Sequence, residues 1–415
     1  MVSGWDSKSF GELFDFSGGL SASRLQLSDV GFPYLHYGDI HSANRPFIDV
    51  CSDNNIPRLN VSLNEVSKEA LLQDGDVVFV DASEDDKGAS SYVVVRNIAD
   101  QPFISGLHTI VAKAKTNELD KGFREYCFQS EDIKRQFRFF AVGTKVVGVS
   151  KSTVKKMVLS YPTEKTEQRF IAAALSDVDN YIAMFEKLIA KKSYIKEGAM
   201  QELLTGNRRL LGFDGKWTRK RIGKIGYSYS GLTGKQKKHF GHGNAKYISF
   251  LNVLLNTIVD VYKLEFVEVC EDERQNSVNI GDLFFNTSSE TPEEVGMCAV
   301  LTQQIEDVYL NSFCFGFRVL DDDIDGLFLA YYFNSIVGRK VMTTLAQGAT
   351  RYNLSKKHFN DTILTLPPKD EQVSIANILS EIDSEIDSLR VELKKMRDIK
   401  QGMMNELLAG RIRLV

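Results

Sequence analysis

The residues best suited to chemistry lie in a basic loop between positions 216 and 246. This stretch carries nine Lys or Arg side chains and two His side chains, and it contains no acidic residue. Tyrosine, threonine and glycine residues are interleaved with the cations. Such a loop can place cations on phosphates, and its polar groups can reach base edges. The pattern favours DNA contact over a solvated surface loop, and its candidate residues are Tyr227, Tyr229, Gly231, Thr233, Lys235, Lys237 and Lys238.

A fainter copy of this stretch occurs near the N-terminus. Trp5 begins a run that ends at Gly19-Leu20, and Trp217 begins a run with the same internal spacing that ends at Gly231-Leu232. The first copy is much less basic, so we expect it to read bases through Ser and Arg more than through electrostatics. Its candidate DNA-binding residues are Ser17, Gly18, Gly19, Ser21 and Arg24.

A hydroxyl and a cation stand side by side after a small residue at two further places. These pairs are Thr144-Lys145 and Thr350-Arg351. Backbone amides in such a loop can hold a phosphate, so both pairs are added as weak DNA-binding candidates. Short motifs of nucleotide binding, methyl transfer, zinc proteolysis and serine hydrolysis are missing from the sequence. The acidic run at 321–325 has no spacing that commits it to a metal, and we interpret it as a solvated turn.

Two long helices must position these loops, because the chain contains one helical stretch twice. Residues 167–206 match residues 371–410 at 17 of 40 positions, at a constant offset of 204. Chance gives about two or three matches, so this is an internal duplication. Both copies carry apolar residues at steps of 3 and 4, the seam of a coiled coil. Thr163 is the expected N-cap of the first helix, Pro368 is expected in the first turn of the second, and Gly206 and Gly410 are expected as left-handed caps.

The repeated apolar and glycine residues define the predicted helix and subunit interface. A glycine inside a helix costs about 1 kcal/mol relative to alanine, so its presence in both copies indicates close approach of another backbone. That backbone could belong to the partner helix or to another subunit. The predicted interface residues are Ile171, Leu175, Ile182, Gly198, Ile375, Leu379, Ile382, Ile386, Leu389 and Gly402.

The rest of the chain predicts mixed α/β domains. Short β-branched and aromatic runs at 77–80, 92–95, 257–261 and 313–319 are typical of strands, and helical stretches at 123–128 and 327–341 precede the long helices. We therefore expect a globular domain at 1–160, a long helix at 161–212, a second domain at 213–365 and a second long helix at 366–415. Paired helices related by a pseudo-twofold axis must run antiparallel, as an intramolecular coiled coil.

Composition narrows the class of protein. Hydrophobic residues make up 43% and charged residues 26%, as in ordinary globular proteins. No apolar run reaches the ~18 residues of a membrane span, and we expect neither a signal peptide nor a membrane association. The five cysteines show no zinc spacing, which fits free thiols in a cytoplasmic protein. A net charge of −4 argues only weakly against nucleic acid.

This order of domain, helix, domain, helix resembles the specificity subunits of Type I restriction–modification enzymes. The motifs that carry the resemblance are Leu-Pro-Pro before Glu371-Gln372, the Leu-Leu-x-Gly helix ends, Gly-Asp76 and Gly-Asp282, and Arg209-Leu-Leu-Gly-Phe213 before Trp217. The first helix departs from the pattern, with Tyr161-Pro-Thr-Glu in place of Leu-Pro-Pro.

The resemblance implies two target-recognition domains that each read half of a bipartite, asymmetric double-stranded DNA sequence. It also implies that the helices set the gap between the halves and dock two modification (methyltransferase) subunits, which restriction (translocase and endonuclease) subunits join. S-adenosylmethionine, ATP and Mg²⁺ are then expected on the partners and not on this chain, which would be non-catalytic. Two other classes remain open, a single-chain DNA methyltransferase or nuclease and a bivalent coiled-coil adaptor without DNA specificity.

Overall fold

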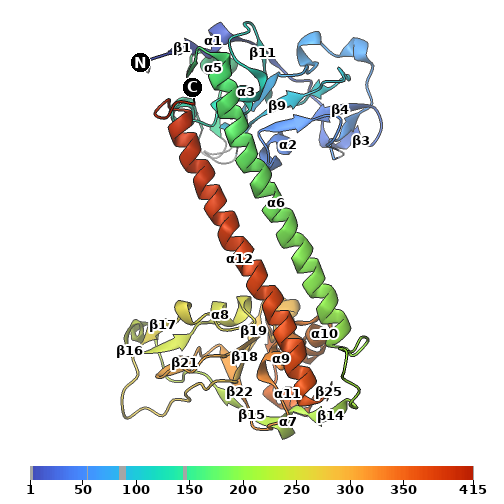
Figure 1. Cartoon of the computed structure of the whole chain (residues 1–415), viewed down its shortest axis with the longest axis vertical. Helices are drawn as coiled ribbons and strands as arrows, with labels where there is room; N and C mark the ends of the chain where they lie inside the picture. The colour runs from blue at the N-terminus through green and yellow to red at the C-terminus, as the bar shows by residue number, and fades with distance from the viewer. Residues whose placement is uncertain (1–2, 54, 84–89, 144–146, 415) are drawn as a thin grey trace. The chain divides into compact units, whose positions relative to one another are not determined.

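The protein consists of two compact units, shown with labelled elements in Figure 1. The computed structural model describes residues 3–53, 55–83, 90–143 and 147–414. Unit 1 comprises Met1–Glu186 and Val391–Val415, and unit 2 comprises Lys187–Arg390. Each unit therefore holds one globular domain and one segment of each long helix, α6 (Lys165–Leu203) and α12 (Lys369–Leu407). The predicted four-part division at 160, 212 and 365 stays a prediction.

The globular domain of unit 1 is built on a mixed five-stranded sheet. Its central strand β7 (Val77–Val80) is buried along its whole length, as an unbroken Val-Val-Phe-Val run requires. The sheet order is β2 (Phe14–Gly18), β11 (Thr109–Ala114), β7, β9 (Tyr92–Arg96) and β5 (Phe47–Asp49), with only β5 and β9 parallel. A smaller sheet has the order β10 (Ile104–Ser105), β4 (Phe32–Leu35), β6 (Arg58–Leu59) and β3 (Leu27–Ser28).

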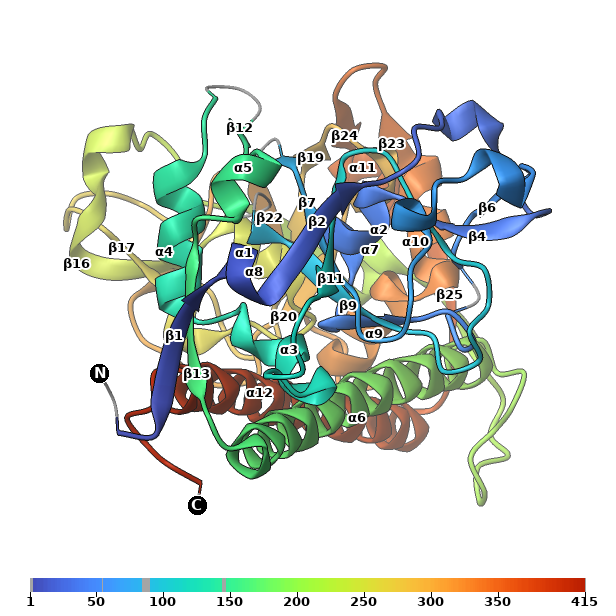
Figure 2. The same cartoon turned by 90° about the horizontal axis from the view of Figure 1, so that it is seen from above.

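Two strand pairs and five short α-helices accompany these sheets in the described residues of unit 1. Strand β1 (Trp5–Ser9) pairs with β13 (Val158–Pro162), and β8 (Ala82–Ser83) pairs with β12 (Val147–Gly148). The helices are α1 (Phe10–Leu13), α2 (Tyr37–Ser42), α3 (Lys121–Cys127), α4 (Glu131–Phe140) and α5 (Lys151–Val154). Figure 2 shows β1 and β13 side by side near the C-terminal end of α12, so both ends of the chain belong to the same corner of unit 1.

Unit 2 repeats this architecture. Its main sheet has the order β15 (Gly226–Ser230), β22 (Cys314–Val319), β18 (Leu283–Asn286) and β20 (Cys298–Val300). A smaller sheet contains β17 (Glu265–Val267), β16 (Phe240–Ile248) and β21 (Val308–Leu310). Strand β14 (Thr218–Arg221) pairs with β25 (Ile363–Leu366), as β1 pairs with β13. A third sheet has the order β19 (Ser288–Ser289), β24 (Tyr352–Leu354) and β23 (Ala346–Gln347).

The helices of unit 2 follow the same order. They are α7 (Ile222–Ile225), α8 (Phe250–Leu255), α9 (Gly326–Asn334), α10 (Ile336–Leu345) and α11 (Lys356–Asp361). The helix predicted at 327–341 is thus two helices, because Ser335 ends α9 and caps α10. The strand predicted at 257–261 is wrong, since this segment meets the sheet only through a single bridge at Ile258.

Within each unit the two long-helix segments run antiparallel. In unit 1, Lys400 pairs with Asp179 and Arg397 pairs with Glu186. In unit 2, Lys196 pairs with Asp383 and Lys192 pairs with Glu385. In each unit, the pair whose α6 residue comes later in the chain has the α12 residue that comes earlier. This is the order of antiparallel helices. The predicted mixed α/β fold with an internal repeat is confirmed.

The seam residues have two different environments. Ile171 and Leu175 belong to the core of the first domain, where they pack with Leu407 and Leu408 from the end of α12. Ile375 and Leu379 are buried in the second domain in the same way, with the Leu-Leu end of α6. Of the other predicted seam residues, Ile386 is buried, and the half-buried ones are Ile182, Ile382 and Leu389. The predicted interface is therefore partly a helix seam and partly a helix–domain core.

Four local predictions concerned helix ends and glycines. Pro368 directly precedes α12, which begins at Lys369, and its carbonyl accepts from the amides of Glu371 and Gln372. Gly206 and Gly410 have φ angles of 76° and 66°, so the predicted left-handed caps are confirmed. Thr163 is not the N-cap of α6, because the helix begins at Lys165 and Glu164 directly precedes it; the Thr163 hydroxyl donates to the carbonyl of Gly4. Gly198 and Gly402 are exposed, and a Cβ atom at either position would meet no described atom within 4 Å. Close approach of the partner helix is therefore wrong as the reason for these two glycines.

Candidate nucleic-acid interface

Each joint between a long helix and a domain contains a buried carboxylate paired with an arginine. In unit 2, the Nε and Nη2 atoms of Arg209 donate to Glu371 at 2.6 Å each. In unit 1, Arg413 makes the same two-pronged pair with Glu167. Both carboxylate side chains are 0% exposed. The two arginines are separated by the same 204 residues as the two glutamates, so the joints are copies of one another.

The neighbouring glutamines hydrogen-bond to the backbone just before each long helix. The Nε2 of Gln168 donates to the carbonyl of Pro162 at 2.8 Å, and that of Gln372 donates to the carbonyl of Pro367 at 2.8 Å. Both glutamines are buried. The repeated Glu-Gln pair is thus explained by what it holds in place, namely the direction in which the helix leaves the domain.

A repeated aspartate about three helical turns further on joins three elements in each unit. Asp179 and Asp383 each accept a hydrogen bond from a tyrosine on a short helix and pair with a lysine on the opposite long helix. Burial and the adjacent carboxylate raise the pKa of both tyrosines, so the phenols stay protonated and donate. The partners are Tyr126 and Lys400 for Asp179, and Tyr331 and Lys196 for Asp383.

The Gly-Asp motif at Asp282 stabilises a turn of unit 2. The carboxylate of Asp282 accepts hydrogen bonds from the amide of Asn279 and from two nitrogens of Arg318, at 2.7–2.9 Å. Tyr229 also donates to Asp282, at 2.6 Å, and is buried. Burial raises the pKa of the Tyr229 phenol, which stays protonated. Tyr229 therefore has a structural role inside unit 2, and its contact with DNA stays a prediction.

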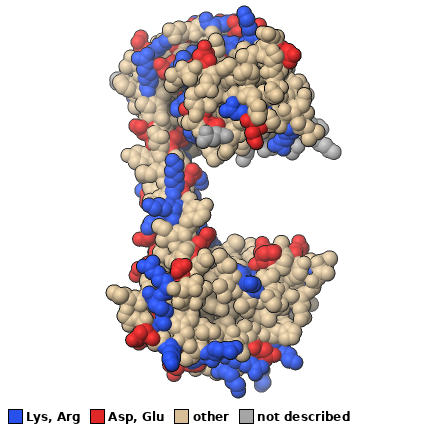
Figure 3. All heavy atoms as spheres, turned by 90° about the vertical axis from the view of Figure 1, so that its right-hand side faces the viewer, with Lys and Arg blue, Asp and Glu red and all other residues tan. Residues whose placement is uncertain are grey.

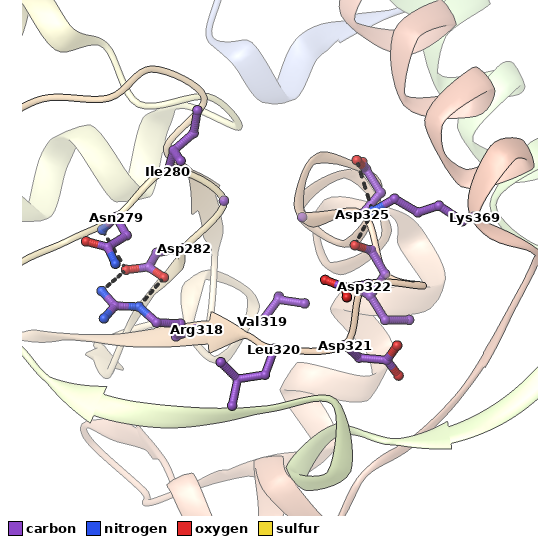
Figure 4. Close-up of a pocket in the computed structure, with 13 residues that line it drawn as sticks. Asn279, Ile280, Asp282, Arg318, Val319, Leu320, Asp321, Asp322, Asp325 and Lys369 are labelled. Carbon is purple, nitrogen blue, oxygen red and sulfur yellow. Dashed lines mark hydrogen bonds and ion pairs between the residues drawn. The ribbon is translucent and has the colours of Figure 1, made fainter.

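A pocket of about 460 Å³ lies beside this turn in unit 2. Figure 4 shows the Asp282–Arg318 pair on one side of it and the Asp321–Asp325 turn with Lys369 on the other. Asp325 accepts from the amide of Phe328 and thereby caps α9. Asp321 pairs with Lys220, whose hydrogen bond lowers the pKa of that carboxyl. The acidic run is therefore a cap and an ion-pair site.

The predicted basic loop of unit 2 contains a lysine that is paired inside the unit and two lysines that are exposed to solvent. The Lys235 side chain is only 3% exposed and pairs with Glu273 at 2.5 Å. Thr233 bonds Gln275 through its amide, at 3.0 Å. Lys237 and Lys238 occupy the exposed 3₁₀ turn Lys237–His239, so these two remain candidates for phosphate contact. Lys235 is paired inside unit 2, and its contact with phosphate stays an untested prediction.

Other cations of the basic stretch lie on a different part of unit 2. Lys220 and Arg221 end β14 and pair with Asp321 and Asp361. Figure 3 shows basic side chains gathered at the end of unit 2 where β14 and α7 lie in Figure 1. Tyr227, on β15, is half-exposed. The nine cations therefore do not form one loop.

The glycines of the two loops have a structural explanation. A Cβ atom on Gly19 would lie 1.9 Å from the carbonyl oxygen of Gly106, and one on Gly231 would lie 2.1 Å from that of Asn311. Only glycine allows these backbones to approach so closely. The two positions are structural copies, and DNA contact at Gly19 and Gly231 stays a prediction.

In unit 1 the loop from Ser17 to Arg24 leaves three polar residues exposed, namely Ser21, Ser23 and Arg24. The Ser17 hydroxyl donates to the carbonyl of Glu69, and Gly18 lies beside the side chain of Lys151. Ser21 and Arg24 are exposed, and Arg24 begins the 3₁₀ turn Arg24–Gln26. This turn corresponds in the repeat to the turn that carries Lys237 and Lys238.

The two hydroxyl–cation pairs are only partly described. Thr144 and Lys145 lie outside the described residues. Thr350 and Arg351 are exposed in the loop between β23 and β24. Both remain predictions of DNA contact.

The sequence interpretation missed Arg209 and Arg413 as paired joint residues. The offset of 204 that aligns the helices continues beyond Gly206 and Gly410 and aligns both the arginines and the leucines that follow them. Extending the alignment by three residues would have found them.

Two further findings concern the described residues alone. None of their helices is long and apolar enough to cross a membrane. Within the same part of the chain, no group of three or more His, Cys, Asp or Glu side chains is arranged to hold a metal ion.

Comparison with known proteins identifies the family to which this duplicated frame belongs. The family model of the Type I restriction modification DNA specificity domain matches residues 2–191 and 215–395, one match for each copy. The chain belongs to this family. The predicted resemblance is confirmed, and the repeat of the specificity domain coincides with the repeat seen in the two units.

Individual relatives are distant but cover most of the chain. The type I restriction enzyme MjaX specificity subunit of Methanocaldococcus jannaschii is 22% identical, over 99% of this chain and 94% of its own length. The MjaVIII specificity subunit of the same organism is 25% identical over 70% of each chain. The solved S subunit from M. genitalium has a TM-score of 0.57 at 15% identity, covering 98% of this chain and 96% of its own.

A chain from a solved structure concerned with complex assembly and conformational transition of the type I restriction–modification system is also similar. It has a TM-score of 0.60 at 16% identity and covers 98% of both chains. At such identities the likeness establishes the fold, which is that of the specificity-domain family.

Proposed function

We propose that this chain is the DNA sequence-recognition subunit of a Type I restriction–modification complex. Each globular domain reads one half of a bipartite, asymmetric target, and the paired helices set the gap between the halves. The observation that carries the proposal is the duplicated frame, in which Glu167–Arg413 and Glu371–Arg209 fix a helix to each domain in the same way. The same helix–domain joint is used for two different domains. This arrangement suits a protein whose two domains recognise different DNA sequences.

The available polar side chains support double-stranded DNA as the ligand. Arg24 in unit 1 and Lys237 and Lys238 in unit 2 are exposed on corresponding turns. Arginine can bind guanine through two hydrogen bonds. Lysine carries a point charge on a flexible side chain, which suits contact with phosphates. The different chemistry of the two turns favours two different half-sites.

The long helices support docking of two modification subunits. Lys191, Ile195 and Gly198 are exposed on α6 at steps of 4 and 3, and therefore share one helix face. The same three residue types recur, exposed, on α12. Identical exposed residues do not serve the internal packing of either unit, and apolar Ile beside Gly suits contact with another helix. The second set is Lys395, Ile399 and Gly402.

In this proposal the chain performs no chemistry of its own. S-adenosylmethionine, ATP and Mg²⁺ belong to the modification and restriction subunits. The repeated polar residues Glu167, Gln168 and Asp179, of which the first two are buried, all have partners within the frame. They therefore serve the architecture, which supports a scaffold and reader in preference to a single-chain methyltransferase.

Expression with the partner modification subunit, followed by genome-wide mapping of methylated bases, tests the proposal. We expect one bipartite motif with an unspecified gap, and no methylation when either chain is expressed alone. Methyl transfer by the purified chain with S-adenosylmethionine, or methylation by the complex at a continuous motif, would contradict it. An adaptor without DNA specificity would leave the modification pattern of the partner unchanged.

A further inference from the structure

A cluster of polar rings lies at one corner of unit 1, where α2 meets the start of β11. The Tyr37 ring is 5.5 Å from the ring of His108 and 6.1 Å from that of His41, at right angles to both. The ring of His36 lies 4.3 Å from Tyr37 and caps α2 by accepting from the amide of Gly38. These side chains form the ring cluster, defined as His36, Tyr37, His41 and His108.

Neighbouring groups orient the ring cluster. Asp81 lies 3.1 Å from the Nδ1 of His108, which leaves Nε2 of that ring as the nitrogen able to meet an external group. Burial lowers the pKa of His36, so its ring is neutral and accepts from the helix. The guanidinium of Arg24 lies 4.0 Å from the position that a Cβ atom on Gly38 would take. Arg24 therefore belongs to the same corner.

His108 is held in an unusual backbone conformation. Its φ angle is 58°, in the left-handed region that residues other than glycine enter infrequently. Its side chain is nevertheless 49% exposed. A costly conformation that presents an exposed imidazole indicates a functional constraint more than a packing one.

Backbone hydrogen bonds identify the matching corner of unit 2. The amide of Gly106 donates to the carbonyl of Leu35, just before α2. In unit 2 the amide of Asn311 donates in the same way to the carbonyl of Ile248, just before α8. Tyr37, which begins α2, therefore corresponds to the first residue of α8.

A second pair of bonds fixes the counterpart of His108. The amide of Asp81 donates to the carbonyl of His108, and the amide of Thr287 donates to the carbonyl of Phe313. Phe313 therefore occupies in unit 2 the place that His108 occupies in unit 1. The shared bonds show that the frame around this position is the same in both units.

The chemistry of the two corners is opposite, although the frame is shared. Phe250 replaces Tyr37, Leu254 replaces His41 and Phe313 replaces His108. Phe313 is 58% exposed, and Leu251 on the adjacent α8 is 61% exposed. Exposed apolar side chains in place of exposed hydrogen-bonding rings do not serve the shared packing. At this corner the two repeats differ in chemistry, and both keep exposed side chains there.

We propose that these two corners determine base specificity. In unit 1, Arg24, Tyr37, His41 and His108 hydrogen-bond to base edges in the major groove. In unit 2, Phe250 and Phe313 contact the methyl group of thymine, which apolar side chains read there. The proposal rests on the function proposed above and names the residues through which each half-site is read.

Reciprocal exchange of the two equivalent residues tests the inference in the complex with the modification subunits. The variants are His108→Phe and Phe313→His, and each imports the residue of the other corner. The controls Ile98→Ala and Leu320→Ala each change an apolar residue, exposed by 89% and 66%, away from the two corners. Methylated-base mapping and titration with duplexes mutated in one half-site give the readout, and chromatography confirms intact complexes.

We expect His108→Phe to change base preference in one half-site only, with about tenfold or greater loss of affinity for the original bases. Phe313→His should change only the other half-site. The gap and the control variants should behave like the wild type. If both motifs stay unchanged, if affinity falls equally for all sequences, or if assembly fails instead, the inference is overturned. In each of these cases a bipartite motif from the wild-type complex would still support the proposed function.

Discussion

Individual lysines of the same stretch have different roles because their surroundings differ. Lys235 is buried against Glu273, whereas Lys237 and Lys238 are exposed two and three residues later. A buried, paired cation is unavailable to phosphate, and an exposed one is free to exchange its counterions for DNA.

Replacing Lys237 and Lys238 together by Ala should weaken binding of the assembled complex to all DNA sequences. Each lost phosphate contact should flatten the slope of log K against log salt by up to about 0.9. Binding titrations at several salt concentrations measure this slope. An unchanged slope would place the DNA away from this turn.

Lys235→Ala should instead alter the pH dependence of stability. The Lys235 hydrogen bond is the main cause that lowers the pKa of Glu273 from 4.5 to about 2. A lowered carboxyl pKa gives stability that is present above pH 4.5 and is lost as pH falls toward about 2. Denaturant unfolding between pH 7 and pH 2.5 should show this loss in the wild type and a smaller loss in Lys235→Ala. If both proteins lost the same stability as pH falls, the role of Lys235 in lowering the pKa of Glu273 would be contradicted.

At the scale of the elements, the duplication made the helices and their C-terminal glycine caps predictable from the sequence. The identities at an offset of 204 persist because Glu167, Gln168 and Asp179 must each meet the same partner in both copies. The site was harder to predict. Lys235 is paired by Glu273, 38 residues away, so neither its burial nor its role can be read from the loop alone. The ring cluster joins residues 36–41 to His108 through strand pairing that local patterns do not show.

The joints should be essential to the attachment of helix and domain. Glu371→Ala leaves Arg209 without its carboxylate inside a buried joint, and we expect the unfolding temperature to fall by roughly 5 to 10 °C. Glu167→Ala should act similarly in unit 1. Arg208→Ala, an exposed neighbour, serves as the matched control in a thermal melt. Equal melting temperatures for Glu371→Ala and Arg208→Ala would show that the pair is not needed.

The exposed glycines should report on assembly and not on folding. Gly198→Leu and Gly402→Leu fill open space, and each gains up to about 1 kcal/mol of helix propensity. We therefore expect an unchanged or slightly raised unfolding temperature together with impaired binding of the modification subunits. Gly198→Ala adds little bulk and should still assemble. Full assembly of both leucine variants, measured by analytical ultracentrifugation, would remove the helices' glycine faces from the docking surface.

At the scale of the whole molecule, each ion pair between α6 and α12 joins two residues of the same unit. The pairs in unit 1 lie before Lys187 on α6 and after Arg390 on α12, and those in unit 2 lie on the other side of these positions. Four residues inserted into α6 alone would break this order. Four residues inserted both between Glu186 and Lys187 and between Arg390 and Val391 keep every pair and add about 6 Å to both helices.

Methylated-base mapping of this double-insertion variant, in complex with its modification subunits, tests the central claim most directly. If the two domains read the half-sites and the helices measure the gap, both half-site sequences will stay the same. The gap will lengthen by one or two base pairs, because DNA rises about 3.4 Å per pair. An unchanged gap at full activity would contradict the account.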